Sequence, residues 1–313
     1  MSLSLGTLTA YVDEHKLPLI VKSLYGGETA QLMNKQTGIK NKATINVLAT
    51  DAVFQADSGC SFASTGTTSI TQRTIEVAPI KVNEDICAKS LRAYYTNKML
   101  AAGSLAEGKS IPFEQEYVEL KASTIATQLE TAYWQGDTSH WNTNLKQFNG
   151  FIKLIDTAAA SVNGNPTSIT TGTGIVAANV VGIFNKIYDL IPLGVIRQSD
   201  TMIFCGTDVF RTYAGALTAA NLFHYTGAEE GGQFTITLPG RSIKVKALPG
   251  LDGTSRIFAG RTSNFYIGSD LEDDSEVFEI WESKDDRNIK YAAEFKVGVQ
   301  VAFPDEIVSF KLI

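Results

Sequence analysis

The chain has 313 residues, a formal net charge of -6 and 44% hydrophobic residues, which suffices for one large domain or two smaller ones. The acidic balance excludes a general nucleic-acid binder, because such proteins need a basic patch to neutralise phosphates. No apolar run approaches about 18 residues, so no transmembrane helix is expected. The start lacks the basic and apolar regions of a signal peptide.

Charged residues make up 19% of the chain, below the usual share of about a quarter, which favours a surface that other subunits partly cover. The three cysteines, Cys60, Cys87 and Cys205, are far apart and odd in number. This pattern favours a reducing compartment without a disulfide framework. The three histidines make no zinc spacing, and we expect no metal and no cofactor.

The first 43 residues show a mixed pattern. A short helical pattern covers Thr9–Lys16, and glycines interrupt the residues after it, at Gly26, Gly27 and Gly38. We therefore predict an N-terminal arm over residues 1–43, extended and with one or two short helices.

Residues 44–78 predict a long β-hairpin. Thr44–Val47 alternates between polar and apolar residues, Ile75–Val77 does the same on the way back, and the serine- and glycine-rich stretch 57–66 lies midway between them. The hairpin has little apolar material for its two faces, and an isolated two-stranded hairpin is marginal in water. We therefore expect it to lie on a neighbouring chain.

The chain after the hairpin predicts more strand and then a helix. The strand is expected to continue from Pro79 through Val82. Asn83 is then a candidate N-cap, with Glu84 and Asp85 in a first helical turn, where negative charge is favoured. Apolar residues recur at helical spacing beyond it, and Gly103 marks the predicted end of this helix.

A second, longer helix is predicted to begin at Ser110 and Pro112 and to end at Gly136. At a rise of about 1.5 Å per residue, some two dozen residues make a rod of roughly 36 Å, which is long enough to serve as a spine. The next residues, up to Gly150, are typical of a loop.

From Phe151 the pattern becomes α+β. A helix is predicted from Val176 to near Pro192, and another after Thr207. The predicted strands are Met202–Cys205, Phe234–Leu238, Ile243–Leu248, Arg256–Ala259, Val277–Trp281, Tyr291–Phe303 and Ile307–Leu312.

Candidate catalytic residues lack the partners that catalysis needs. Cys205 ends an apolar strand just before a helix, where a thiol could ionise, but no base accompanies it and a core cysteine is the favoured interpretation. The acidic stretch 271–276 lacks EF-hand spacing and is better explained as a solvated turn. No hydrolase or metalloprotease motif is present, so we do not expect an enzyme.

The order of the elements and several stretches of sequence resemble the major capsid protein of tailed bacteriophages, whose Hong Kong 97-like fold encapsulin shells share. The stretches are "VNEDICAKSLRAYYTNKML", "IFCGTDVFRTYAGAL" and "EFKVGVQVAFPDEIV". The resemblance covers patches from Thr44 to the end of the chain, and it implies an α+β capsid fold.

This resemblance also implies a division of the chain. Residues 1–43 would form the N-terminal arm, and 44–78 an extended hairpin loop that lies over an adjacent subunit. Residues 79–150 would form a peripheral domain with the spine helix. Residues 151–260 would form an axial domain whose loops meet at the centres of the rings, and 261–313 strands that return to the peripheral domain.

The implied function is a structural one: self-assembly into hexamers and pentamers of an icosahedral shell that encloses double-stranded DNA without gripping it. The alternative is an encapsulin-type nanocompartment shell; a metabolic enzyme and a tail or baseplate protein are rivals from other classes. Two groups of residues are candidate inter-subunit contacts. The hairpin tip contributes Gly59, Cys60 and Phe62, and an acidic, glycine-rich loop near the ring axis contributes Glu229, Glu230, Gly231 and Gly232.

The resemblance also implies partners and a location. The expected partners are further copies of the chain, a portal, a scaffolding protein and decoration proteins, in a virion capsid assembled in the bacterial host cytoplasm. The short arm leaves no room for an internal scaffolding segment, so a separate scaffolding protein or an already processed chain is expected. No lysine lies between Thr44 and Ile80, so an isopeptide cross-link from this loop is not expected.

Overall fold

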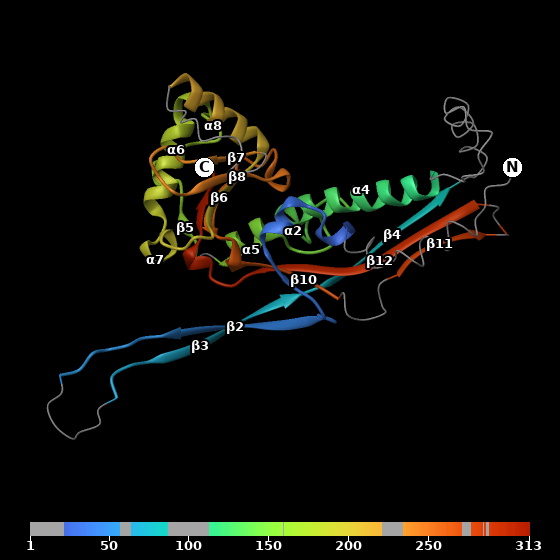
Figure 1. Ribbon diagram of the computed structural model, residues 1–313, viewed down its shortest axis with the longest axis horizontal. Helices are drawn as coiled ribbons and strands as arrows, with labels where there is room; N and C mark the ends of the chain where they lie inside the picture. Colours follow the sequence, from blue (N-terminus) through green and yellow to red (C-terminus); the bar gives the residue numbers. More distant parts are fainter. Residues whose placement is uncertain are drawn as a thin grey trace, which may run out of the picture.

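Two β-sheets with helices packed on them form the body of the chain, and a two-stranded hairpin projects from it (Figure 1). The computed structural model describes residues 22–56, 64–86, 113–158, 160–220, 234–270, 277–283, 285 and 288–313.

The first sheet is built around the long strand β12 (Asn288–Val301). Its order is β1 (Asn34–Gln36), β10 (Phe265–Ser269), β12 and β11 (Val277–Ser283), with β4 (Ala78–Ile86) paired on the opposite edge of β12. β12 alternates between buried and more exposed residues over most of its length, as expected for a strand with one face on the core.

The helix expected to begin at Asn83 does not begin there. Asn83 pairs with Ala292 and Asp85 with Lys290 in the antiparallel ladder between β4 and β12. Glu84 is half-buried while its neighbours are exposed, which is a strand pattern. A cap contributes only about 1 kcal/mol, and the ladder offered by β12 outweighs it. The remainder of that predicted helix lies outside the described residues.

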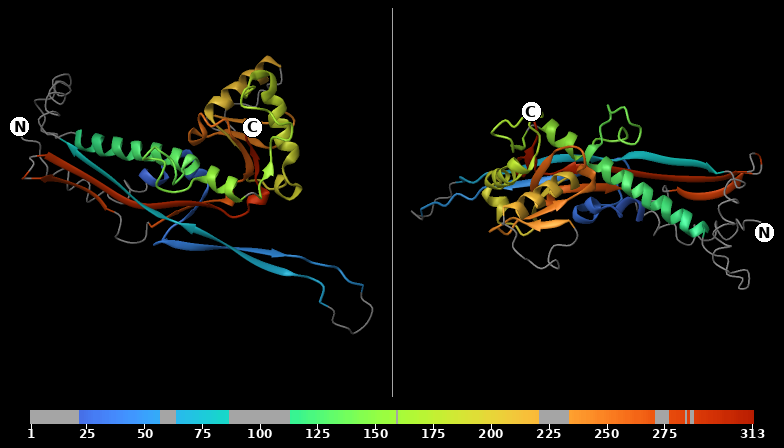
Figure 2. Two further views of the ribbon diagram at one scale, coloured as in Figure 1. Left: turned by 180° about the vertical axis from the view of Figure 1, so that it is seen from behind. Right: turned by 90° about the horizontal axis from the view of Figure 1, so that it is seen from above.

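The predicted spine helix is confirmed as α4 (Phe113–Gln135), which runs alongside β4 and β12 (Figures 1 and 2). Tyr117 on α4 donates a hydrogen bond to the Glu84 carboxylate at 2.9 Å and meets the ring of Tyr291 edge-on. The short helix α2 (Glu28–Leu32) packs on α4, and its neighbours Leu24 and Met33 are buried in the same core. Residues 22–36 are therefore part of the body.

A buried polar contact fixes this N-terminal segment to the spine. The Glu130 carboxylate accepts the backbone N–H of Thr29 at 3.0 and 3.2 Å and also its hydroxyl. Trp134 donates its indole N–H to the Thr29 hydroxyl oxygen at 2.7 Å. Burial raises the pKa of Glu130, because a charged carboxylate loses its hydration there.

Trp134 is the centre of the main core. Its ring contacts the rings of Phe151, Phe204, Phe258 and Phe265. Against it lies η1 (Pro249–Leu251), where a Cβ on Gly250 would lie 2.5 Å from Trp134 Cδ1. The close approach requires glycine at this position, and it joins the spine to the second half of the chain.

The second sheet has the order β5-β13-β9-β6-β8-β7. Its strands are β5 (Val162–Asn163), β13 (Val308–Phe310), β9 (Ile257–Arg261), β6 (Thr201–Cys205), β8 (Lys244–Ala247) and β7 (Thr235–Thr237). The C-terminal segment contributes to both sheets, because η3 (Pro304–Glu306) turns the chain between β12 and β13.

Helices pack on the second sheet and bury a core of their own (Figure 1). They are α6 (Ala177–Leu190), α7 (Leu193–Ile196) and α8 (Thr207–Ala219), while α5 (Phe151–Ala158) packs beside α4 and η2 (Thr262–Asn264) precedes β10. The helices and strands predicted from Phe151 onward are confirmed, with ends that differ by a few residues. Strands β5 and β10 and the helices α5 and α7 were not predicted.

The predicted hairpin is confirmed as β2 (Lys42–Thr50) and β3 (Thr68–Glu76), paired from Lys42↔Glu76 at the base to Thr50↔Thr68. The hairpin extends away from both sheets (Figure 2). Its base carries a small core of buried apolar side chains with contributions from the body, namely Ile39, Ile45, Val47, Ile75, Val77 and Ala302.

The base of the hairpin crosses the first sheet at two facing glycines. Gly268 on β10 and Gly298 on β12 are register partners. A Cβ on Gly298 would lie 2.0 Å from the backbone carbonyl oxygen of Glu76, and one on Gly268 would lie 2.7 Å from Ile75 Cδ1. We call this pair the glycine crossing. It allows the hairpin backbone to lie directly on the sheet.

Substituting Gly298 by alanine should displace the hairpin base and destabilise the chain by about 2 kcal/mol or more, since a backbone oxygen occupies the space the new methyl needs. Chemical denaturation of the purified subunit measures this change. The matched control is Gly182→Ala in α6, where nothing lies within 4 Å, and it should stabilise by up to about 1 kcal/mol. Equal stabilities for the two variants would contradict the prediction.

Candidate inter-subunit surface

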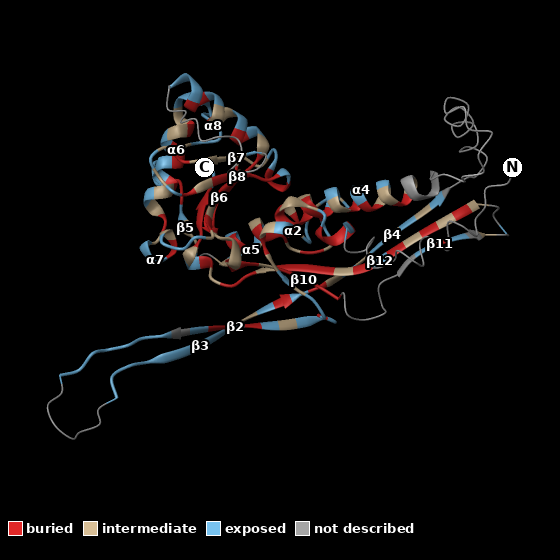
Figure 3. Ribbon diagram, viewed as in Figure 1, coloured by how far each residue is buried: buried red, intermediate tan, exposed pale blue. Residues whose placement is uncertain are grey.

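Burial changes sharply along the hairpin (Figure 3). In β3 the residues Thr68–Gln72 are all exposed, whereas Ile75 near the base is fully buried. We call the described residues 48–56 and 64–72 the outer finger. It carries large exposed apolar side chains, with exposed fractions of 61% for Leu48, 50% for Val53, 99% for Phe54 and 65% for Ile70. Apolar side chains gathered on such a projection mark a surface for another chain.

The outer finger has polar cross-strand contacts in place of a core. Asp51 N–H donates to the Thr67 carbonyl at 2.9 Å, and Gln55 donates to the Thr65 hydroxyl. In sequence, residues 48–72 carry two aspartates, Asp51 and Asp57, and no lysine or arginine. The outer finger therefore carries one acidic side chain, Asp51, together with apolar side chains in water.

The sequence-based contact residues lie outside the described part of the chain. Gly59, Cys60 and Phe62 belong to the stretch 57–63, and Glu229, Glu230, Gly231 and Gly232 belong to 221–233. Their contacts stay predictions. Sequence analysis missed Phe54 as a surface residue, although the shortage of apolar residues for two hairpin faces was the available signal.

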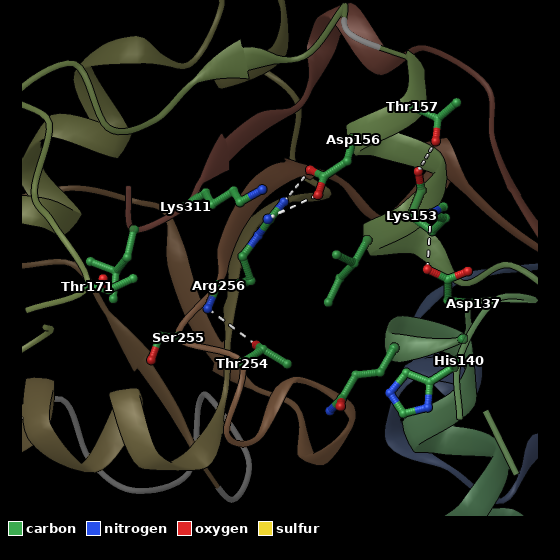
Figure 4. A pocket seen from close by; sticks show the side chains of 14 residues that line it. Asp137, His140, Lys153, Asp156, Thr157, Thr171, Thr254, Ser255, Arg256 and Lys311 are labelled. Atoms are coloured by element: carbon green, nitrogen blue, oxygen red, sulfur yellow. Dashed lines mark hydrogen bonds and ion pairs between the residues drawn. The ribbon is translucent and has the colours of Figure 1, made fainter. Parts of the chain in front are cut away.

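A second surface feature is a cavity of about 770 Å³ (Figure 4). Five segments line it: the end of α4 and the following loop, α5, the loop between β5 and α6, the turn before β9, and the C-terminal residues after β13. The lining residues are Gln135, Gly136, Asp137, His140, Ile152, Lys153, Asp156, Thr157, Thr171, Thr254, Ser255, Arg256, Lys311 and Leu312.

The acidic side chains of the cavity are already paired. Asp156 receives two N–H groups of Arg256, one of them at 3.1 Å, and Asp137 pairs with Lys153 at 3.0 Å. The Ser139 backbone N–H and the Lys153 amine hold the pKa of Asp137 below its usual range. Lys311 points its amine into the cavity toward Arg256 and makes no ion pair with a described residue.

The candidate nucleophile of the sequence analysis is a core residue. Cys205 is fully buried in β6, and burial raises the pKa of its thiol, so the core interpretation of this cysteine is confirmed. Within the described ranges no three His, Cys, Asp or Glu side chains gather to hold a metal ion. His224 and the acidic stretch 271–276 lie outside these ranges. Among the helices that the structure describes, none has the length and apolarity to span a membrane.

Comparison with solved structures identifies the fold. The procapsid of satellite phage P4 matches with a TM-score of 0.61 and 12% identity, over 95% of this chain and 97% of that one. The capsid of the native GTA particle matches with a TM-score of 0.54 and 13% identity, over 93% and 90%. The capsid of Myoviridae phage XM1 matches with 0.53 and 12%, over 90% of both chains.

The chain therefore has the fold of phage capsid proteins along nearly its whole length, and the α+β capsid fold predicted from the sequence is confirmed. No protein-family model and no curated protein sequence matches it. The sequence identities to these solved structures are only 11–14%, so the similarity is evident in the fold and not in the sequence.

Replacing Phe54 by serine should leave the stability of the isolated subunit unchanged, because the ring is 99% exposed and has no packing to lose. It should raise the protein concentration needed for assembly by about threefold to tenfold, since an apolar anchor is lost from the contact. Sedimentation velocity across a concentration series measures this. Ala56→Ser, a change at a neighbouring exposed position, is the control, and equal behaviour of both variants would contradict the prediction.

Proposed function

We propose that this chain is the major capsid protein of a tailed bacteriophage, which assembles into hexamers and pentamers of an icosahedral shell around double-stranded DNA. One observation carries the proposal: on a capsid fold, the outer finger exposes Leu48, Phe54 and Ile70 to water and has no core of its own. Such a segment becomes stable when an adjacent copy covers it.

In this proposal the subunits form head-to-tail rings. Each outer finger lies on the next subunit, so donor and acceptor surfaces differ and the ring closes by rotation. Each contact is modest, and closure adds many contacts at high effective concentration. A body with two joined cores and the stiff spine α4 suits subunits that reorient as units while the hairpins maintain the contacts.

The proposal also assigns roles to the segments of the chain. Residues 44–78 act as the extended loop, 79–150 as the peripheral domain and 151–260 as the axial domain, while 1–43 and 261–313 complete the body. The hairpin tip with Cys60 contacts a neighbouring subunit, and the loop with Glu229 faces the ring axis.

The proposed assembly takes place in the bacterial host cytoplasm with a portal, a scaffolding protein and decoration proteins as partners, and its product is the virion capsid. The net charge of -6 supports a shell that encloses DNA without binding its sequence. An encapsulin-type shell is not favoured, because the matching structures above are a phage capsid, a phage procapsid and a GTA capsid.

The direct test is assembly of the purified full-length chain, observed by negative-stain electron microscopy and sedimentation velocity, with and without the candidate scaffolding protein from the same gene neighbourhood. We expect rings of five and six subunits and closed shells. A chain that stays monomeric at every concentration, or forms only open tubes, would contradict the proposed function.

A further inference from the structure

The cavity next to α5 has one positive charge more than its own acids neutralise. Asp137 and Asp156 are held by Lys153 and Arg256, while Lys311 points into the same space and has no acidic partner among the residues described. The Asp156 carboxylate offsets the guanidinium of Arg256, so the Lys311 ammonium is the positive charge left over in the cavity.

Further polar groups in the cavity are available to a ligand. Thr171 and Ser255 line the space, and among the residues that the structure describes no hydrogen bond involves their hydroxyls. A carboxylate with its two oxygens could accept hydrogen bonds from both hydroxyls. The volume of about 770 Å³ falls in the range of pockets that hold ligands.

The outer finger carries the complementary groups. Asp51 provides a carboxylate, and Phe54, three residues further on, is 99% exposed. Beside the cavity, His140 stacks on Trp141 with ring centroids 5.5 Å apart, and Trp141 is 88% exposed. Each surface thus combines one charge with an exposed aromatic ring, and the two charges have opposite signs. Exposed tryptophan side chains are frequent anchors of interfaces.

We propose that this cavity receives the outer finger of a second copy of the chain, with the Asp51 carboxylate bound by Lys311. The inference rests on the proposed function and names the acceptor surface of its head-to-tail contact. A finger cannot serve its own cavity, because it projects away from α5 and the body (Figures 1 and 2). DNA is a poorer occupant, because the cavity offers one unneutralised positive charge, whereas binding consecutive phosphates needs several.

The test is a charge reversal in the full-length chain. Asp51→Lys and Lys311→Glu should each lower the yield of rings and shells more than about tenfold at roughly 0.1 M salt, because like charges then face each other in every contact. The double variant should recover at least about half of the wild-type yield, because the pair is restored with its signs exchanged. The control Lys146→Glu makes the same charge change as Lys311→Glu at an exposed position outside the pair, and Ala52→Lys places a lysine on the finger while keeping Asp51. Both controls should assemble as wild type.

Mixing the two single variants gives a sharper readout. In each variant the charge on the finger is opposite to the charge in the cavity of the other variant. It has the same sign as the charge in the cavity of its own variant and is repelled by it. Equimolar mixtures should therefore form rings in which the variants alternate, and alternation closes only with an even number of subunits. Native mass spectrometry should detect hexamers at near wild-type amounts and pentamers reduced more than about tenfold.

Each outcome decides the matter. Single variants that assemble as wild type, a double variant that does not recover, or mixtures rich in pentamers overturn the inference and leave the proposed function standing. If Lys311→Glu forms normal shells but retains less DNA, the cavity contacts nucleic acid and the inference is overturned. A wild-type chain that forms no rings overturns the proposed function and the inference together. Thermal unfolding of both single variants at wild-type temperature excludes misfolding as the cause of lost assembly.

Discussion

Replacing residues 51–67 by an Asn-Gly turn should abolish shell formation while the subunit stays folded. Thr50 and Thr68 are register partners, so a two-residue turn can join β2 and β3 without changing their register. The variant removes Val53 and Phe54, which are exposed in the subunit and which an adjacent copy would cover. Loss of this contact from every subunit should lower the shell yield by far more than about tenfold.

The same variant should unfold within about 2 °C of the wild-type subunit, because the described residues among those removed are exposed and the buried base around Ile45 and Ile75 is retained. Electron microscopy measures shells, and calorimetry measures unfolding. Normal shells from this variant would show that the outer finger is not needed for assembly. A large drop in the unfolding temperature would mean that the finger stabilises its own chain.

Substituting Glu130 by alanine should destabilise the subunit by about 2–3 kcal/mol. The change leaves the buried N–H and hydroxyl of Thr29 without their acceptor, and an unpaired buried donor costs about 1–3 kcal/mol. It also frees the N-terminal segment from α4. Urea denaturation measures the loss. Ser123→Ala, at an exposed position on the same helix, is the control and should change stability by less than about 0.5 kcal/mol.

The contribution of Glu130 should also depend on pH. Burial raises its pKa in the folded chain above the value of about 4.3 in the unfolded chain. The folded state then binds the proton more tightly than the unfolded state does. The contribution of Glu130 to the free energy of unfolding is therefore fully present below the pKa of the unfolded chain and is lost as the pH rises through the pKa of the folded chain. The stability difference between wild type and Glu130→Gln should be largest near pH 4 and smaller at pH 7. A difference that grows with pH would contradict this sign.

The sequence predicted those elements whose signals are local. The spine helix lies between Pro112 and Gly136, and these residues mark its ends without reference to the rest of the chain. The hairpin followed from alternation on both strands and a serine- and glycine-rich turn. The exposure of the outer finger was predicted from the shortage of apolar residues for two hairpin faces, because composition alone shows that shortage.

The sequence did not predict features that depend on distant segments. Asn83 and Glu84 satisfy the rules for a helix start, and only the length of β12, some two hundred residues later, makes them a strand. Strand β10 has no strong alternation of its own and exists because β1 and β12 lie on either side of it.

The candidate acceptor surface was missed for the same reason. Lys153, Arg256 and Lys311 are ordinary charged residues in their local sequences, and only folding brings them around one cavity.

The glycine crossing has a consequence for how such a protein can vary. The direction in which the hairpin leaves the body is set at the glycine crossing: the backbone of Glu76 lies on Gly298 and the Ile75 side chain lies on Gly268, with no side chain of the outer finger involved. Residues further out can be exchanged or lengthened, or can carry an inserted peptide, without changing that direction. The partner that a tip recognises and the geometry of the particle can therefore evolve, or be engineered, as two separate properties.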